Sequence, residues 1–485
     1  NVSAKGFDQM LAEQRGAWAK RWEMNDIVIE GDVAAQQAIR FNIFQLNQTY
    51  TGEDPRLNIG PKGFTGEKYG GSTYWDTEAY CLPFYMLTAG SEVAKQLLLY
   101  RYRQLDKAIE NAGKLGFNDG AALYPMVTMN GEECHNEWEI TFEEIHRNGA
   151  IAYAIYNYIS HTGDRDYLKE GGLEVLLGIS RFWSQRVNWS SAKNQYVMLG
   201  VTGPNEYENN VNNNWYTNYI AKWTMSYARE SIEYVKADSA FWSDFVSKTS
   251  FQDCEVEKWS DIIEKIYEPK KEGTKLYMQQ DGFLDKEDLT AADLDVSERP
   301  INQHWSWDRI LRSVFIKQAD VLQGMYFFEE DFDEETIRDN FLYYEPRTVH
   351  ESSLSPCVHV VLAAKLGMYD KAYEMYLRTA RLDLDDYNHE ADEGLHITSM
   401  AGTWMAVVEG FGGKRIKNGV LSLDPMIPEQ WTSYRFNIVY RETVLSISVN
   451  GGGVSVKNES GDTCDILVYG KSVSVPQGDT ISVAK

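Results

Sequence analysis

Along most of the chain, apolar residues recur every three or four positions, the spacing of one helix face. Asp32 can cap a helix whose apolar residues recur through positions 39–46, and a further helix is expected from about 141 to 162. Gly163 follows it, where a left-handed residue commonly ends a helix. Residues 357–380 are expected to form a helical hairpin. Because no fixed sequence period repeats, the pattern favours a closed toroid of helices over an open solenoid.

The period changes to two after the glycine-rich stretch at 410–413. Within residues 434–485, apolar side chains alternate with polar ones at 436–440 and again at 445–449. A turn signal at Asn450-Gly-Gly-Gly453 follows the second of these runs. The C-terminal end is therefore predicted to be a small all-β domain.

These patterns divide the chain into three parts. Residues 1–29 are expected to form a linker helix, mainly over Gly6–Met24, residues 30–413 a helical domain, and residues 414–485 the β domain. The chain begins with Asn1 rather than an initiator methionine, so we expect it to be a piece of a longer protein.

The net charge limits which kinds of molecule the protein can bind. The 485 residues include 47 basic and 72 acidic ones, for a net charge of −25, and no Lys/Arg run offsets it. Nucleic acid and anionic membranes are therefore not expected as partners. An anionic substrate would approach against the overall field, so a phosphate site would have to be built locally from helix ends and a few cations.

The cysteines do not suggest disulfides or a metal site. They are odd in number, scattered, and show neither CxxC nor metal-site spacing. Free thiols in a reducing compartment are the simplest interpretation. No apolar run approaches 18 residues, so we expect a soluble, cytoplasmic protein. The cysteines are Cys81, Cys134, Cys254, Cys357 and Cys464.

The stretch 200–218 combines a Gly-Pro turn, an acid and many asparagines. Glu206 lies on this loop, and the helix that follows carries an inward-facing aromatic stripe at i, i+4 spacing. An acid beside amides and aromatic faces suits a sugar, which is bound by directional hydrogen bonds and ring stacking. The alternative is a solvent loop with a surface glutamate. The stripe consists of Trp215, Tyr219, Trp223 and Tyr227.

Two further stretches could hold a sugar. Trp75 and Asp76 stand side by side just before an expected helix, although Asp76 could be an N-cap and Trp75 a core residue. Lys317 and Gln318 are expected within a helix, where such a pair is ordinarily solvated.

Two other stretches could hold an anion. Ser352 and Ser353 precede Ser355-Pro356, a cap-then-N1 signal, so this serine cluster is expected at the positive end of a helix. His396 and Thr398 also lead into a helix. Plain capping is the alternative for each, but two helix N-termini with hydroxyls and a histidine could together cradle phosphate.

Five stretches, in this order along the chain, resemble glycoside hydrolase family 65, the disaccharide phosphorylase family: Tyr74–Glu78, Gly203–Tyr207, Lys317–Asp320, Glu351–Ser355 and Leu395–Ile397. The resemblance extends across about residues 1–480. Several spaced motifs in order are more specific than any one alone.

The resemblance implies an (α/α)6 barrel followed by the β domain, and it assigns roles. It implies that Glu206 is the general acid. The residues that it aligns with the site for the non-reducing glucose are Trp75, Asp76, Lys317 and Gln318. Those that it aligns with the phosphate site are Ser352, Ser353 and His396. Beyond the aligned residues, we expect Thr398 to bind phosphate as well and Trp215 to bind the substrate.

Segment Glu132–Gly149 is most similar to that of family members acting on maltose. From it, His135, Glu137 and Trp138 are proposed to contact the second sugar, unless they only stabilise the loop. Family members also carry an N-terminal β-sandwich followed by a linker helix, and only the linker-like helix is expected in this chain. The family resemblance also implies a homodimer.

The expected reaction is an inverting attack by phosphate on maltose, giving glucose and β-D-glucose 1-phosphate, reversibly. The leaving oxygen needs a proton, whereas phosphate is already anionic near pH 7 and needs no base. No metal or organic cofactor is implied. Phosphorylases of trehalose, kojibiose or nigerose are alternatives, as is a non-catalytic sugar-binding toroid. A third alternative is an inverting α-glucosidase with Glu351, Glu390 or Glu393 as the base for water.

Overall fold

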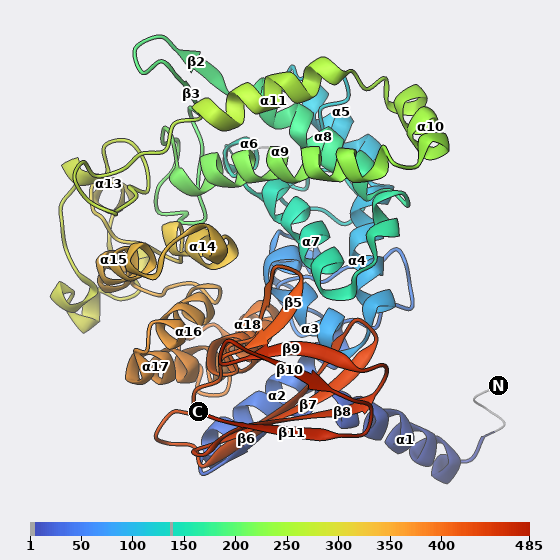
Figure 1. Ribbon diagram of the computed structural model, residues 1–485. Helices are drawn as coiled ribbons and strands as arrows, with labels where there is room; N and C mark the ends of the chain where they lie inside the picture. The colour runs from blue at the N-terminus through green and yellow to red at the C-terminus, as the bar shows by residue number, and fades with distance from the viewer. Residues whose placement is uncertain (1–4, 136–138) are drawn as a thin grey trace.

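Helices dominate the computed structural model, which describes residues 5–135 and 139–485 (Figure 1). The helices are α1 Phe7–Asn25, α2 Val33–Thr49, α3 Leu82–Thr88, α4 Ser91–Arg103, α5 Leu105–Lys114, α6 Ile140–Glu143, α7 Arg147–Thr162, α8 Gly172–Arg186, α9 Trp215–Val235, α10 Ser239–Thr249, α11 Asp253–Lys265, α12 Ile301–His304, α13 Trp307–Leu311, α14 Val321–Phe327, α15 Glu334–Tyr344, α16 Ser355–Lys365, α17 Tyr369–Ala380 and α18 Ile397–Met405.

The strands are β1 Val28–Glu30, β2 Asn188–Ser190, β3 Gln195–Val197, β4 Arg415–Lys417, β5 Val420–Leu423, β6 Ser433–Tyr440, β7 Thr443–Asn450, β8 Gly453–Ser460, β9 Cys464–Val468, β10 Lys471–Val475 and β11 Thr480–Ala484. They form a five-stranded sheet in the order β1-β6-β7-β8-β11, a four-stranded sheet in the order β10-β9-β5-β4, and the hairpin β2-β3.

The two ends of the helical region meet. Helix α18 packs against α2, and Asn42 Nδ2 donates a hydrogen bond to Thr403 Oγ1 at 3.1 Å. The helices between them follow one another around the body from blue to orange in Figure 1. This contact joins segments 361 residues apart and places the loops that follow α2 near those that precede α18.

Local signals explain several helix ends. Asp32 Oδ1 accepts from the backbone N–H of Ala35 at 2.9 Å, which confirms the expected cap of α2. Gly163 ends α7 with a φ of +76°, and Gly367 separates α16 from α17 with a φ of +73°, so both turns use left-handed residues. Helix α7 begins at Arg147 rather than near residue 141, because residues 140–143 form the separate short helix α6.

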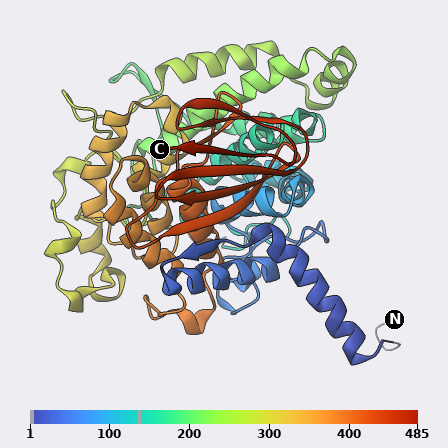
Figure 2. The same ribbon diagram turned by 60° about the horizontal axis from the view of Figure 1, so that its bottom comes forward.

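The period-two pattern at the C-terminal end forms the expected strands. Strand β6 alternates between buried and more exposed residues, and the turn between β7 and β8 lies at residues 451–452. Strand β1, which precedes α2, pairs with β6 and so ties the start of the chain to the C-terminal sheet. Figure 2 shows this sheet lying across the helices and α1 projecting away from the body.

Two other features concern the chain as a whole. All five cysteines are free thiols, as expected. Within residues 5–135 and 139–485, no helix has both the length and the apolar composition needed to span a membrane.

Candidate active site

The loop that carries Glu206 is fixed by its neighbour Asn205, which is fully buried. The backbone N–H of Asn205 donates to Asp320 Oδ2 at 3.1 Å, and Asn205 Oδ1 accepts from the backbone N–H of Lys317 at 2.9 Å. Lys317 Nζ in turn donates to Glu206 Oε2 at 2.7 Å. The expected acid and the expected sugar-binding lysine are therefore in direct contact, 111 residues apart in sequence.

Close packing holds the same loop from the other side. A Cβ on Gly203 would lie 2.2 Å from Asp320 Oδ2, so only glycine fits there. Asn214 caps α9 and donates to Asp320 Oδ1 at 2.9 Å. Trp215 is fully buried against Tyr219. The structure thus places Trp215 in the core beneath the loop, where its ring has no exposed face for a sugar.

Lys317 and Gln318 do not lie in a helix, contrary to expectation, because α14 begins only at Val321. Burial opposes the charge of Lys317, but Glu206 raises the pKa of Lys317 overall. Gln318 is only 2% exposed, and neither its Oε1 nor its Nε2 has a hydrogen-bond partner among the described residues. A buried amide without partners is costly, which makes Gln318 a strong candidate for binding sugar hydroxyls.

Asp76 directly precedes the π-helical turn η3 (Thr77–Cys81) but makes no side-chain capping bond. Instead, Asp76 Oδ2 accepts from the hydroxyl of Thr398 at 2.8 Å. Burial raises the pKa of Asp76 to about 7, against the effect of that hydrogen bond, and the charge of Glu206 adds to the rise. Trp75, buried beside it, meets the ring of His146 edge-on at 4.8 Å. Asp76 and Thr398 thus join stretches expected to bind sugar and phosphate.

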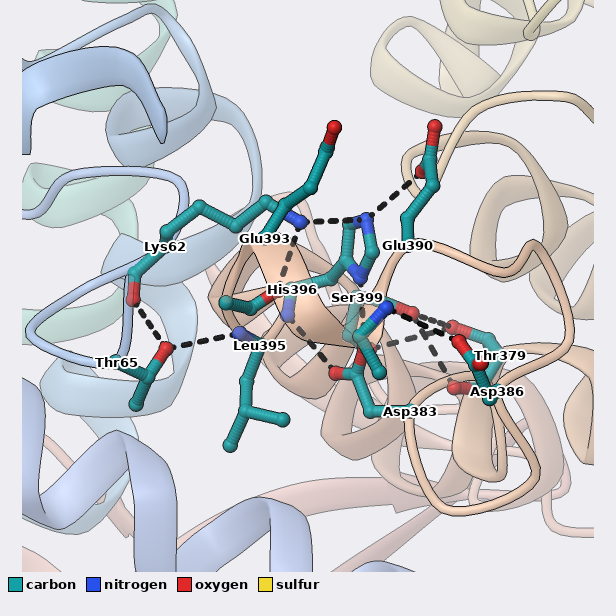
Figure 3. A network of polar contacts seen from close by, with 12 residues as sticks. Lys62, Thr65, Thr379, Asp383, Asp386, Glu390, Glu393, Leu395, His396 and Ser399 are labelled. Carbon is teal, nitrogen blue, oxygen red and sulfur yellow. Dashed lines mark hydrogen bonds and ion pairs between the residues drawn. The ribbon is translucent and has the colours of Figure 1, made fainter. Parts of the chain in front are cut away.

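His396 lies at the centre of a polar network (Figure 3). Its Nδ1 is 2.6 Å from Asp383 Oδ1, and its backbone N–H donates to Asp383 Oδ2 at 2.8 Å. On the other side of the ring, His396 Nε2 is 2.9 Å from Lys62 Nζ and 3.3 Å from Glu390 Oε2. Asp383 therefore orients the ring, and Nε2 faces a cation and a carboxylate.

Lys62 was not expected from the sequence. Burial lowers the pKa of Lys62, against the charges of Asp383 and Glu390. Burial would also lower the pKa of His396, but hydrogen bonds with Asp383 and Glu390 raise it overall. A 2.9 Å contact between the two nitrogens requires one of them to accept, so the two side chains cannot both be fully protonated while this contact is made. No local signal could reveal Lys62, which lies 334 residues from His396 in sequence.

Ser352 and Ser353 are half-buried in the turn before α16. Ser355 is not the helix cap that was expected, because α16 starts at Ser355 itself and its hydroxyl contacts His350 Nδ1 at 2.8 Å. The serines nevertheless lie at the N-terminal end of α16, where backbone N–H groups favour an anion.

Glu351 links these serines to the loop of Glu206. The backbone N–H of Glu351 donates to the carbonyl oxygen of Lys317 at 3.2 Å, and the hydroxyl of Tyr207 donates to Glu351 Oε2. Acid, lysine and serine turn therefore form one connected group.

Two cavities border the group formed by Glu206, Lys317 and Glu351. One, of about 360 Å³, is lined by Glu206 and Lys317, and the other, of about 450 Å³, by Glu351 and Glu390. Asn302 lines both cavities. The carboxyls near the expected sugar and phosphate positions thus face adjoining spaces.

The segment expected to contact the second sugar is only partly described. His135 is exposed, and its Nε2 lies 3.3 Å from the hydroxyl of Tyr74, next to Trp75. Glu137 and Trp138 lie outside the described residues.

Comparison with known families matches both the helical body and the C-terminal β domain. Residues 40–405 match the central catalytic domain of glycosyl hydrolase family 65, and residues 415–475 match the C-terminal domain of that family. The chain therefore belongs to glycosyl hydrolase family 65.

Individual relatives share most of this chain. It is 55% identical to the maltose phosphorylase of Bacillus subtilis (strain 168) over 98% of this chain and 61% of the relative. It is 37% identical to the alpha,alpha-trehalose phosphorylase of Thermoanaerobacter brockii over 98% of this chain and 61% of the relative. The solved structure named "Putative kojibiose phosphorylase from human microbiome" superposes with a TM-score of 0.93 at 36% identity, covering 99% of this chain and 70% of that one. The chain thus spans about 61% of the length of these curated relatives.

Proposed function

We propose that this chain carries out the inverting phosphorolysis of maltose, in which phosphate releases glucose and β-D-glucose 1-phosphate reversibly. The contact between the Glu206–Lys317 pair and the turn of Ser352 carries this proposal, because it puts one acid next to an anion-binding helix end. The 55% identity to a maltose phosphorylase supports the choice of sugar.

In this proposal, the helical region is a closed (α/α)6 barrel over residues 30–413, with a linker helix at 1–29 and a β domain at 414–485. The packing of α18 against α2 supports the closure. The loops that carry Asp76, Glu206 and His396 then gather at one mouth of the barrel.

Glu206 donates the proton to the glycosidic oxygen. Without substrate, Lys317 Nζ donates a hydrogen bond to Glu206 Oε2 at 2.7 Å, so the lysine occupies the carboxyl group that must reach the glycosidic oxygen. Sugar binding must therefore separate this pair. Lys317 turns to a glucose hydroxyl, with Gln318 and Asp76 holding the same glucose, and Glu206 is freed to carry its proton.

Phosphate is the nucleophile. Ser352, Ser353 and the N–H groups at the start of α16 hold its oxygens, and the cationic Lys62–His396 pair neutralises its charge. An oxygen of phosphate attacks the anomeric carbon from the face opposite Glu206. The bond to the leaving sugar breaks as the proton arrives, so the α linkage becomes a β phosphate.

Each of the three carboxylates considered as a base for water has a partner. Glu351 accepts hydrogen bonds at both oxygens, from the hydroxyl of Tyr207 and from the backbone N–H of Ile301. Glu390 contacts His396 and Glu393 pairs with Lys68, each through one oxygen. A base for water needs a free oxygen aimed at the anomeric carbon. Because Glu351 contacts the loop of Glu206 and has neither oxygen free, its engagement favours phosphate as the attacking group.

The other elements of the proposal follow from the same reasoning. No metal or organic cofactor is needed, since phosphate arrives as an anion and Glu206 supplies the proton. We also propose a homodimer, as the family resemblance implies, and a cytoplasmic location, in keeping with five free thiols.

The test supplies maltose, trehalose, kojibiose and nigerose separately, each with and without phosphate, and follows glucose release. The expected result is release from maltose only when phosphate is present. Release without phosphate would support the α-glucosidase instead. Release from another disaccharide in preference to maltose would change the substrate but keep the reaction. Binding of maltose with no release under any condition would support the non-catalytic toroid.

A further inference from the structure

An aromatic residue that no motif explains lines the cavity next to Glu206. Trp307, the first residue of α13, is 45% exposed and borders the cavity of about 360 Å³ together with Glu206, Lys317 and Asn302. We propose that Trp307 is the stacking platform for the leaving sugar and thereby a specificity-determining residue. This inference rests on the proposed function.

The ring of Trp307 is held in place from the catalytic loop. Tyr207, the residue after Glu206, meets it edge-to-face with ring centroids 6.0 Å apart and planes at 84°. Tyr207 is only 2% exposed, and its hydroxyl is bonded to Glu351, so it cannot turn freely. A rigid aromatic neighbour fixes the orientation of the Trp307 ring, and the exposed part of that ring offers an apolar surface to the flat side of a sugar ring.

The neighbouring tryptophan shows what a purely structural role looks like here. Trp305 is 8% exposed, the guanidinium of Arg309 lies 3.4 Å above its ring, and its Nε1 donates to Glu298. Its nitrogen and its cation-facing side are thus already used. Trp307, two residues later, keeps a large apolar surface exposed beside the cavity that Glu206 and Lys317 line.

The position of the cavity assigns the platform to the leaving sugar. Trp75 and Gln318, which would hold the retained glucose, are buried, whereas Trp307 and Asn302 are exposed and border the cavity next to Glu206. Ile140, which follows the segment expected to contact the second sugar, borders the same cavity. The leaving glucose would therefore lie in this cavity against Trp307, with its glycosidic oxygen towards Glu206.

The test compares two donors whose leaving groups differ, maltose and α-glucosyl fluoride, both with phosphate. Trp307→Ala should reduce kcat/KM for maltose by roughly 10- to 100-fold, because the sugar loses an aromatic face. The reduction for α-glucosyl fluoride should be less than about 3-fold, since fluoride has no ring to stack. Trp307→Phe should recover most of the maltose activity.

Trp189→Ala is the matched control. Trp189 is 46% exposed on strand β2 and borders neither of the two cavities at the site. Its variant should keep both activities. An equal loss on both donors with Trp307→Ala, or no loss on maltose, would overturn the inference.

Failure of the Trp307 inference can be distinguished from failure of the proposed function. The wild-type protein is first assayed with and without phosphate, which decides the attacking group. If water attacks instead, the maltose-to-fluoride ratio of Trp307→Ala can still be measured by sugar and fluoride release. A lower ratio would then support the platform in a hydrolase. In the reverse reaction, Trp307→Ala should raise KM for acceptor glucose more than KM for β-D-glucose 1-phosphate.

Discussion

Two groups of buried charged residues differ in whether the protein itself compensates for their lost hydration. The first, here called the base network, joins the helical body to the C-terminal β domain. Glu409 pairs with Lys414 at 2.9 Å, and Glu329 pairs with Arg415 at 2.8 Å. Burial alone would raise the pKa values of Glu409 and Glu329, but their cations hold both below the usual value. Every one of these four charges has a partner.

The candidate active site is the opposite case. Burial raises the pKa of Asp76 to about 7. Glu144 belongs to the same group, because burial and then the charge of Glu206 raise its pKa well above the usual value. Glu144 Oε2 and both amide atoms of Gln318 have no hydrogen-bond partner among the described residues. The base network compensates burial within the protein, whereas the site leaves that compensation to a ligand. Incomplete pairing distinguishes the functional cluster from the structural one.

The largest effect is expected for Glu206→Gln, which removes the proton donor. Turnover of maltose should fall by roughly 10³-fold or more. Turnover of α-glucosyl fluoride should fall far less, because fluoride leaves with little need for a proton. Parallel steady-state assays of the two donors measure this contrast. Equal activity of the variant on maltose would remove Glu206 from the acid role.

Breaking the base network should affect stability, not chemistry. Glu409→Gln leaves the buried ammonium of Lys414 without its counterion and should cost about 3–5 kcal/mol in free energy of unfolding. Urea denaturation measures this loss, and kcat/KM of the folded protein should stay near that of the wild type. The control is Glu335→Gln, which breaks an exposed pair with Lys275 and should cost less than about 1 kcal/mol. Similar losses in both variants would contradict the contrast between paired and exposed charges.

Asp76→Asn should separate stability from binding. In the folded protein, the pKa of Asp76 is about 7, above the usual 3.8. Between these two pH values, the folded protein keeps the Asp76 proton that the unfolded chain has released. Stability should therefore fall as pH rises from about 4 to about 7. Asp76→Asn removes that cost and should stabilise the protein at pH 8 by about 1–3 kcal/mol, while weakening sugar binding.

Thermal unfolding at pH 4.5 and pH 8, with and without maltose, checks this prediction. The stabilising effect of the substitution should be larger at pH 8. A variant that is less stable than the wild type at pH 8 would mean that Asp76 is compensated within the protein, as in the base network.

The smallest effect is expected at Glu390, whose carboxylate competes with phosphate for His396 Nε2. At pH 6, Glu390→Gln should lower KM for phosphate by about 2- to 5-fold, because a rival anion is removed. Glu390 also raises the pKa of His396, so His396 should lose its charge at a lower pH in the variant than in the wild type. The lower KM for phosphate should therefore be lost as pH rises. Glu393→Gln, on the same loop but paired with Lys68, is the control. A higher KM at pH 6 would mean that Glu390 helps to bind phosphate.

The sequence was most informative where a local signal sufficed. Asp32, Gly163 and the alternation in β6 act within a few residues, so periodicity and turn chemistry predicted them. The aromatic stripe of α9 was also predicted to face inward, and its members are buried or half-buried. The sequence could not predict which residues the stripe packs against, because partners of Trp215 such as Tyr277 are distant in sequence.

The site depends on contacts between distant segments, and local reasoning missed those. Lys62 meets His396 across 334 residues, and Tyr207 meets Glu351 across 144. The capping signal at Ser355 was misleading, because its hydroxyl turns to His350. Lys317 was expected in a helix, but the hydrogen bond from its backbone to Asn205 holds it in an irregular segment before α14. A lone exposed tryptophan such as Trp307 gives no signal until its cavity is known.

The central claim is that phosphate attacks the sugar from the face opposite Glu206. The most direct measurement follows the anomeric proton of the first-formed sugar phosphate by NMR, in a reaction of maltose with inorganic phosphate. The account predicts β-D-glucose 1-phosphate in equal amount to released glucose. Formation of the α anomer, or of glucose with no sugar phosphate, would contradict it.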